Sequence, residues 1–395
     1  MNALTRTPRR LRALLPSAVS IALLLVAGIG TTALAGYWNP QVTVRQLPQE
    51  MDPRPEDLSA GGVNVVAGWR QEAVASNNGQ MWVRDSTDSG GTFGPWLRLA
   101  ADPARPQNEL SLDSGGGSHW AAWSEMMPTA MWPQRSRIFL GAKPYAAGFW
   151  DVIPVSTNAD IGRRPTVVHT TGRVFVVYQA RISGAFRVLI QNTLTDEGVF
   201  GGTSNLGSAP WSNGAPHADA TNSRLHVVWS DGNVRLKRAS LGGGPGYSVN
   251  WQATQNLGPG ESPIVVTGGM RVVIFYYRNG DTWVRVSENS GGSFAAAEKL
   301  MDGDPKVYVY QPESAAISGT RVVVSVLGGG DAFGTGHRLQ SFDGGETWST
   351  TTSNPNFSDW RKLAFTSEAG SAKLAELWFD DLFEDNNKIV YRRQD

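Results

Sequence analysis

The stretch PIVVTGGMRVVIFYYRNGDTWVRVSENSGGSFAAAEKLM, residues 263–301, decides the fold. It predicts a first strand over 263–267, a Gly268-Gly269 turn, a second strand over 271–276 and a third over 282–286. SENSGGSF then forms a tight turn, and a fourth strand begins at 298–301. Short β-branched and aromatic runs separated by glycine and asparagine are typical of antiparallel strands joined by tight turns. The stretch therefore predicts one four-stranded antiparallel sheet.

The same order of segments recurs along the chain about every 50 residues. The expected second strands end near Trp69, Trp123, Tyr178, Trp229, Tyr276, Val326 and Trp378. Successive positions in this series are 47–55 residues apart, and a period of that size indicates a repeat architecture. A repeat of four antiparallel strands is typical of a propeller blade. We therefore predict an all-β fold, a seven-bladed β-propeller of four-stranded antiparallel blades over residues 36–395.

The seventh repeat supplies only three expected strands, over 362–366, 373–379 and 388–393. The segment QVTVRQL, residues 41–47, resembles the fourth strands WQATQNL and WLRLA of other repeats. We predict that this N-terminal strand completes the last blade and closes the ring, because its pairing would leave no open sheet edge.

Residues 1–35 have the features of a secretory signal peptide. Arg6, Arg9, Arg10 and Arg12 precede an apolar stretch over 18–30, and Ala33-Leu34-Ala35 is a small-x-small cleavage signal. The mature chain is expected to begin at Gly36 and to be secreted or held in the periplasm or cell envelope. An uncleaved anchor is the alternative. The apolar stretch is shorter than the roughly 20 residues that span a bilayer, which favours the signal peptide over the anchor. We expect no stable membrane span after cleavage.

The composition narrows the classes of partner. There is no cysteine, and lysine plus arginine equals aspartate plus glutamate at 35 each, which argues against nucleic acid as a partner. The five histidines show no paired metal-ligand spacing. We expect a monomer with no metal and no cofactor. The acidic residues Asp380, Asp381, Glu384 and Asp385 leave two interpretations open, a calcium loop or a polar cap on the seventh blade.

Three turns between expected third and fourth strands share the pattern S-x-[DN]-x-G-x-[TS]-[FW]. They lie at 86–93, 287–294 and 341–348. The side chains of Asp88, Asn289 and Asp343 can accept hydrogen bonds from amides of their own turns, and the glycine supplies positive φ. The terminal aromatic can fill the space between adjacent sheets. We predict a structural role for these three residues.

The pattern resembles the Asp-box, or bacterial neuraminidase repeat, of the sialidase-like β-propeller superfamily, and the resemblance covers residues 36–395. In that superfamily the Asp-boxes lie on the face opposite the active site. The resemblance therefore implies a functional face made by the loops that join blades and by the loops between second and third strands. It implies glycan recognition or hydrolysis, with a sialidase-like exo-glycosidase as the leading activity.

Sialidase chemistry uses three arginines that hold a substrate carboxylate, a tyrosine nucleophile with a glutamate base, and an aspartate acid. The candidates are the arginines Arg70, Arg164 and Arg278, the nucleophiles Tyr277 and Tyr310, the bases Glu261 and Glu313, and the acid Asp102. Three loop tryptophans, Trp132, Trp211 and Trp360, are candidates for stacking on sugar rings.

Two departures from the sialidase pattern count against the enzyme. True sialidases have six blades, and they carry an Arg-Ile-Pro motif near the first blade. This chain lacks that tripeptide, and Arg163-Arg164-Pro165 is its nearest approach. Seven-bladed relatives with Asp-boxes include glycan-cleaving propellers and assembly factors that hold a protein. The alternative prediction is therefore a non-catalytic propeller that binds a protein partner at the cell surface or outside the cell.

Overall fold

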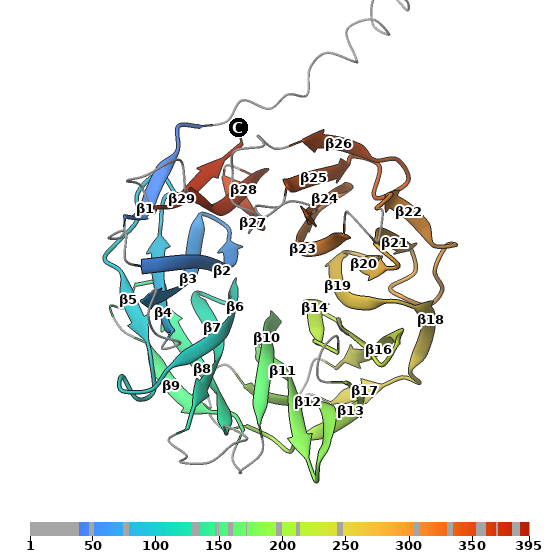
Figure 1. Cartoon of the computed structure of the whole chain (residues 1–395), viewed down its shortest axis with the longest axis horizontal. Coiled ribbons are helices and arrows are strands. Elements are labelled where there is room, and N and C mark those ends of the chain that lie inside the picture. The colour runs from blue at the N-terminus through green and yellow to red at the C-terminus, as the bar shows by residue number, and fades with distance from the viewer. Residues whose placement is uncertain are drawn as a thin grey trace, which may run out of the picture.

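The chain forms an all-β, seven-bladed propeller, seen here in a computed structural model (Figure 1). The structure describes residues 39–46, 51–73, 79–127, 135–146, 148, 150–156, 161–170, 172–194, 200–210, 214–242, 248–303, 309–329, 335–352, 361–368, 370–380 and 388–394. Within these ranges no helix is long and apolar enough to cross a membrane. The predicted fold class is confirmed.

The blades are numbered I to VII, and within each blade the strands run outward from the ring axis. Blade I contains β2 (Met51–Gly61), β3 (Asn64–Ala73), β4 (Gln80–Ser86) and β5 (Leu97–Leu99). Blade II contains β6 (Gln107–Gly115), β7 (Ser118–Met126), β8 (Ser136–Pro144) and β9 (Asp151–Pro154). Blade III contains β10 (Gly162–Thr170), β11 (Arg173–Ile182), β12 (Ala185–Leu194) and β13 (Ser204–Ser208).

The remaining blades repeat this order. Blade IV contains β14 (His217–Thr221), β15 (Arg224–Ser230), β16 (Asn233–Leu241) and an outer edge in two pieces, β17 (Val249–Trp251) and β18 (Gln255–Pro259). Blade V contains β19 (Glu261–Gly268), β20 (Arg271–Arg278), β21 (Asp281–Ser287) and β22 (Glu298–Met301). Blade VI contains β23 (Val309–Ser318), β24 (Arg321–Gly329), β25 (Thr335–Ser341) and β26 (Ser349–Thr352).

Blade VII is built from both ends of the chain, as predicted. Its strands β27 (Arg361–Glu368), β28 (Ser371–Asp380) and β29 (Lys388–Arg393) are joined by β1 (Val42–Gln46) as the outer strand. Strand β1 pairs antiparallel with β29, with Val42 opposite Tyr391, and the amide of Asn39 donates to the carbonyl of Arg393 at 2.8 Å. Figure 1 shows this blue strand beside the red end of the chain. The N-terminal strand therefore closes the ring.

The core lies between neighbouring blades. The aromatic tips Trp69, Trp123, Trp229, Tyr276 and Trp378 of the second strands are at most 2% exposed. Trp69, Trp123, Trp229 and Tyr276 each belong to a buried cluster that contains residues of two adjacent blades. The periodic aromatics are therefore packing residues.

The three patterned turns have a common hydrogen-bonded geometry. In the first, Asp88 Oδ1 accepts from the Thr92 amide at 2.8 Å and from the Ser86 hydroxyl at 2.7 Å. Asn289 Oδ1 and Asp343 Oδ1 accept corresponding bonds in the other two turns. A hydrogen bond from the Thr347 hydroxyl is the leading cause that lowers the pKa of Asp343. These side chains hold their own turns.

Candidate functional site

The topology gives the ring two unequal faces. The first strand of each blade begins on the face where the second strand ends, and the turn after the third strand lies on the opposite face. The patterned turns at Asp88, Asn289 and Asp343 therefore share one face. The residues at the starts of first strands and the ends of second strands share the other face, which we call the mouth face.

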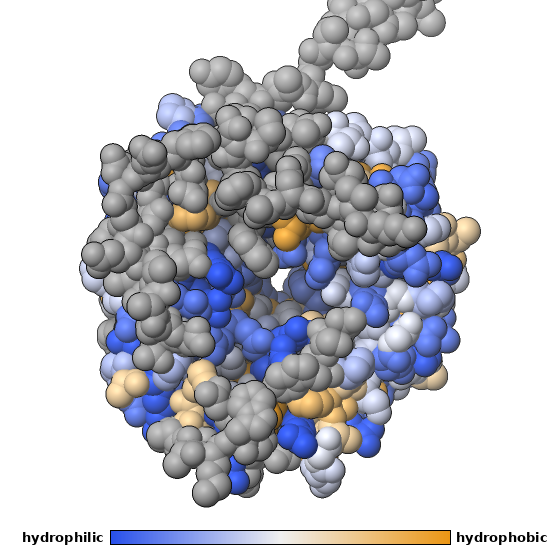
Figure 2. Space-filling model, in the orientation of Figure 1, coloured by the Kyte–Doolittle hydropathy of each residue, from blue (hydrophilic) through white to orange (hydrophobic). Residues whose placement is uncertain are grey.

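An axial channel of about 390 Å³ runs between the first strands of all seven blades. Figure 2 shows its opening at the centre of the molecule, among polar side chains. Its titratable lining residues are Glu56, Asp57, Asp113, His217, Asp219, Glu313 and Lys362. Five carboxyl groups thus share the channel with a single lysine and a single histidine among its lining residues.

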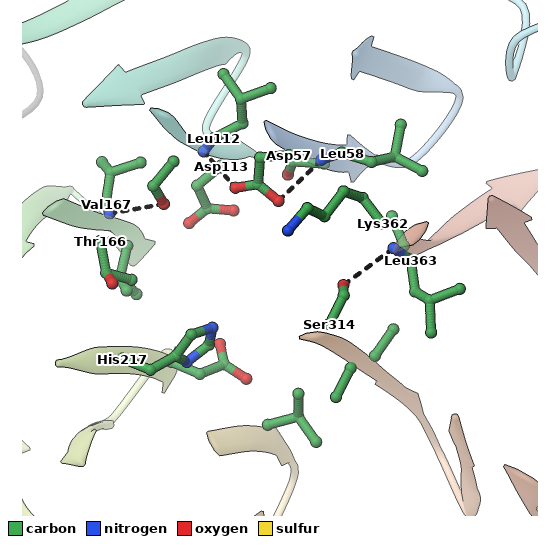
Figure 3. A pocket seen from close by; sticks show the side chains of 18 of the residues that line it. Asp57, Leu58, Leu112, Asp113, Thr166, Val167, His217, Ser314, Lys362 and Leu363 are labelled. Carbon is green, nitrogen blue, oxygen red and sulfur yellow. Dashed lines mark hydrogen bonds between the residues drawn. The ribbon is translucent and has the colours of Figure 1, made fainter. Parts of the chain in front are cut away.

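One position of the first strands forms a ring inside this channel. In each second strand one residue comes just before the tip residue, and its pairing partner on the first strand occupies this position. In blades I, II, III, IV, VI and VII the partner is Asp57, Ser111, Thr166, His217, Ser314 and Lys362. Here Asp57 Oδ2 accepts from the Leu112 amide of the next blade at 2.6 Å, and Ser314 Oγ accepts from the Leu363 amide at 3.0 Å. Figure 3 shows both bonds, with Lys362 pointing into the channel. We call this position the upper ring.

Two more aspartates form equivalent links deeper in the channel. Asp113 Oδ2 accepts from the amide of His169 in blade III at 2.5 Å, and Asp219 Oδ2 accepts from the amide of Thr267 in blade V at 2.6 Å. A side chain of one blade thus satisfies a backbone donor on the exposed inner edge of the next blade, where no strand can pair. These aspartates tie the blades together around the axis.

Burial in the channel shifts the pKa values of these groups towards their neutral forms. It raises the pKa of Asp57 and of Asp113 to about 6 and that of Asp219 to about 7. Burial, together with the smaller effect of the charge of Lys362, lowers the pKa of His217 to about 4. Carboxyl groups that titrate near neutral pH can exchange protons under ordinary conditions.

β-Bulges occur where the first strands meet the mouth face. The pairing register shifts at Glu56 in β2, at Glu109 in β6 and at Glu313 in β23. Corresponding shifts at Arg164 in β10 and Ser262 in β19 have positive φ values of 49° and 47°. A bulge turns a side chain away from the regular alternation, and bulges are enriched beside active sites. The same irregularity therefore recurs at the mouth of the channel.

Two of these bulge residues flank Lys362. Strand β27, which carries Lys362, packs between β2 with Glu56 and β23 with Glu313. Burial raises the pKa of Glu56, and the charges of Arg70 and Lys362 oppose that rise. Burial likewise raises the pKa of Glu313, opposed by Lys362. We call Glu56, Glu313 and Lys362 the mouth triad.

The predicted arginines Arg70 and Arg164 both pair with carboxylates, Arg70 with Glu56 of the triad and Arg164 with Glu109 of blade II. Arg70 is within 3.5 Å of Glu56 and 3.0 Å of Glu72, and it donates to Asn108 Oδ1 at 3.1 Å. The next residue, Glu109, accepts from the backbone amide of Arg164 at 2.6 Å. Its carboxylate also lies 4.0 Å from the Arg164 guanidinium. Both arginines are thus engaged with protein carboxylates.

The third predicted arginine lies elsewhere on the ring. Arg278 ends β20 in blade V, and its guanidinium carbon lies 5.2 Å from the centre of the Trp283 ring. Its neighbour Tyr277 is paired across the sheet with Glu261 of β19. The structure thus brings the predicted tyrosine Tyr277 and the predicted glutamate Glu261 together on blade V. Arg70 and Arg164 lie on other blades, I and III.

The remaining candidates lie apart from one another. Tyr310 packs beside the core of blades V and VI, 5.4 Å from the His337 ring, whereas Glu313 of the same strand lines the channel. Asp102 lies in the loop between blades I and II and pairs with Arg105 at 3.0 Å. Trp132, Trp211, Trp360 and residues 381–387 lie outside the described residues. Within the described ranges, no group of three histidine, aspartate or glutamate side chains could hold a metal ion.

Sequence reasoning did not single out Glu56 and Lys362 as site residues. Glu56 is one charge among many in the loops that join blades, and Lys362 is the first polar residue of an ordinary strand. A signal for Glu56 was present, because it lies 13 residues before Trp69, just as Glu313 lies 13 residues before Val326. Aligning the repeats on these tips would have placed Glu56 at the position of Glu313. Lys362 lies 16 residues before Trp378, so the same alignment does not find it.

No known protein-family model matches this sequence, and no curated protein matches it. The phage phi92 endosialidase matches 91% of this chain at 9% identity, covering 69% of its own chain, with a TM-score of 0.52. The Penicillium chrysogenum α-L-arabinanase, complexed with arabinobiose, matches 91% of this chain and 98% of its own at 15% identity, with a TM-score of 0.50.

A Trypanosoma rangeli sialidase, in complex with the inhibitor DANA, matches 88% of this chain at 11% identity with a TM-score of 0.46. The chain spans 60% of the length of that sialidase. The chain thus shares the β-propeller fold of the endosialidase and the arabinanase. At these identities the likeness establishes the fold alone, and the chemistry must be argued from the site.

Proposed function

We propose that this protein acts on glycans at the mouth of the axial channel, as a glycoside hydrolase that uses Glu56 and Glu313. The observation that carries the proposal is the mouth triad, in which two half-buried glutamates flank one lysine at the edge of a cavity. The names of the endosialidase and the arabinanase support the substrate class, since both describe enzymes of glycans on this fold. The predicted signal peptide would export the chain to where such glycans are found.

Two carboxyl groups suffice for glycoside hydrolysis. One protonates the leaving oxygen, and the other activates water or attacks the anomeric carbon. Glu313 suits the acid, because burial raises its pKa and Lys362 is the one opposing charge. Glu56 suits the base or nucleophile, because both Arg70 and Lys362 favour its ionised form.

The geometry favours this pair over the sialidase scheme. Arg70 and Arg164 already contact Glu56, Glu72 and Glu109, so a substrate carboxylate would compete with groups of the protein. Tyr310 lies in the packing between blades, away from Glu313. A neutral sugar is therefore the better-suited substrate, and we propose it as the class to test first.

The test is turnover by Glu56→Gln and Glu313→Gln on a panel of fluorogenic glycosides and reducing-end assays on polysaccharides. Each substitution keeps the shape of the side chain but removes its titrating group, so turnover should fall about 10²–10⁴-fold. Glu288→Gln is the matched control, because this exposed glutamate pairs with Arg271 on the opposite face. It should retain full activity.

Other outcomes discriminate among hypotheses. Turnover that survives both glutamate substitutions but disappears in Tyr277→Phe would contradict the two-carboxylate mechanism and favour the Tyr277–Glu261 pair. Binding to glycans without turnover would show a lectin. Absence of both binding and turnover would leave the alternative, a scaffold that binds a protein.

A further inference from the structure

The outer edge of blade I carries an exposed aromatic side chain that the channel site does not use. Trp96 immediately precedes β5, and 43% of its surface is exposed. Its ring centre lies 4.5 Å from that of Trp82, at an interplanar angle of 68°. The guanidinium carbon of Arg45, in the closing strand β1, lies 4.3 Å from the Trp96 ring centre. Strands β1 and β5 are the outer strands of blades VII and I, and Figure 1 shows both on the same part of the rim.

A single arginine fixes the backbone that presents Trp96. Arg84 donates from Nε to the carbonyl of Gly94 at 2.6 Å and from Nη2 to the carbonyl of Phe93 at 3.0 Å. Its Nη1 donates to the carbonyl of Val44 in β1. The loop before Trp96 is therefore anchored both to its own blade and to the closing strand. An aromatic surface held in place before a ligand arrives loses little conformational freedom on binding.

Blade V provides a comparison within the same chain. At a spacing of 201 residues it repeats Trp82, Arg84 and Phe93 as Trp283, Arg285 and Phe294. Arg285 Nη1 donates to the carbonyl of Ala295 at 3.1 Å, just as Arg84 donates to that of Gly94.

At the position of Trp96, blade V has Ala297, which packs against the same core cluster as Trp283 and Phe294. Blade V thus forms the same strands with alanine where blade I has a half-exposed indole. The blade fold does not require the indole.

We propose that Trp96 and Arg45 form a secondary glycan-binding site on the rim, which takes a pyranose ring of a polysaccharide. The apolar C–H face of such a ring packs against the exposed indole, while the guanidinium donates hydrogen bonds to its hydroxyl oxygens. The choice of ligand rests on the proposed function of the channel mouth. A second contact on the rim would hold a polymeric substrate while the mouth acts on one of its units.

Affinity electrophoresis of the full chain in gels that contain xylan, galactan or mannan, which are neutral polysaccharides of pyranose rings, tests this inference. Trp96→Ala copies the residue of blade V, so its thermal midpoint should stay close to that of the wild type. Its affinity for the retarding polysaccharide should fall about three- to tenfold. Trp96→Phe should lose less affinity for the polysaccharide than Trp96→Ala, because phenylalanine keeps an aromatic surface. Turnover of small fluorogenic glycosides should be unchanged in both variants.

Three results would overturn the inference. The first is equal retardation of the wild type and Trp96→Ala, which would show that Trp96 does not bind the polysaccharide. This result would not affect the proposal for the channel mouth. The second is a lowered thermal midpoint with unchanged affinity, which would make Trp96 a seal over the closing strand. The third is a wild type that no polysaccharide retards. In that case turnover of small glycosides still decides the channel-mouth proposal separately.

Discussion

At the scale of single residues, the channel aspartates combine two properties. Asp219 accepts the Thr267 amide of the next blade, and burial raises its pKa to about 7. An unfolded aspartate titrates near pH ~3.9. Between these two values the folded state binds more protons than the unfolded state, so the contribution of this group to stability is lost as the pH rises.

The substitution Asp219→Asn removes this titration. Relative to the wild type, the variant should be most destabilised near pH 5. The difference in free energy of unfolding between the wild type and the variant should be about 1–3 kcal/mol smaller near pH 8 than near pH 5. At pH 8 only the wild type carries a half-buried charge. Urea unfolding at the two pH values measures the gap.

Ser314→Ala is the matched control for Asp219→Asn, since it removes a cross-blade acceptor that does not titrate. Its destabilisation should be the same at both pH values. If the difference in free energy of unfolding between the wild type and Asp219→Asn instead grows towards pH 8, the folded protein stabilises the carboxylate as the anion.

At the scale of elements, the strands were predictable and their irregularities were not. The period of β-branched runs and aromatic tips predicts the blades and the closing strand, because packing between sheets repeats a local pattern. The bulges at Glu56, Glu109 and Glu313 recur from blade to blade, but they interrupt the hydrophobic alternation without a residue pattern that marks them in the sequence. These bulges are the part of the fold that makes the site.

The closing strand β1 supplies a direct test at this scale. Val44 is fully buried in the core between blades VII and I, whereas Thr43 is exposed on the same strand. Val44→Asp should lower the free energy of unfolding of the whole domain by about 3 kcal/mol or more, since it buries an unpaired charge. Deletion of residues 36–50 should have the same sign.

Thr43→Asp controls for the introduced charge and should leave the thermal midpoint nearly unchanged. An unaltered midpoint in both Val44→Asp and the deletion would mean that the ring is stable without its closing strand.

At the scale of the whole molecule, ring closure assembles the candidate site from distant segments. Lys362 of blade VII lies between Glu56 of blade I and Glu313 of blade VI, because β27 packs against both β2 and β23 in the closed ring. The sequence therefore supplied candidate residues, such as Arg70, Glu313 and Asp102, but could not show which of them lie close together in the fold. Of these, the closed ring brings Arg70 and Glu313 to the channel mouth and leaves Asp102 in its own loop.

The most direct test of the channel-mouth site is a crystal structure of Glu313→Gln soaked with the oligosaccharide that the wild type cleaves or binds best. The proposed site predicts that a sugar ring lies at the axial channel, with its glycosidic oxygen within hydrogen-bond distance of residue 313 and its anomeric carbon near Glu56. A sugar ring bound at Tyr277 and Glu261, or on the face of Asp88 and Asp343 with the channel mouth empty, would contradict it.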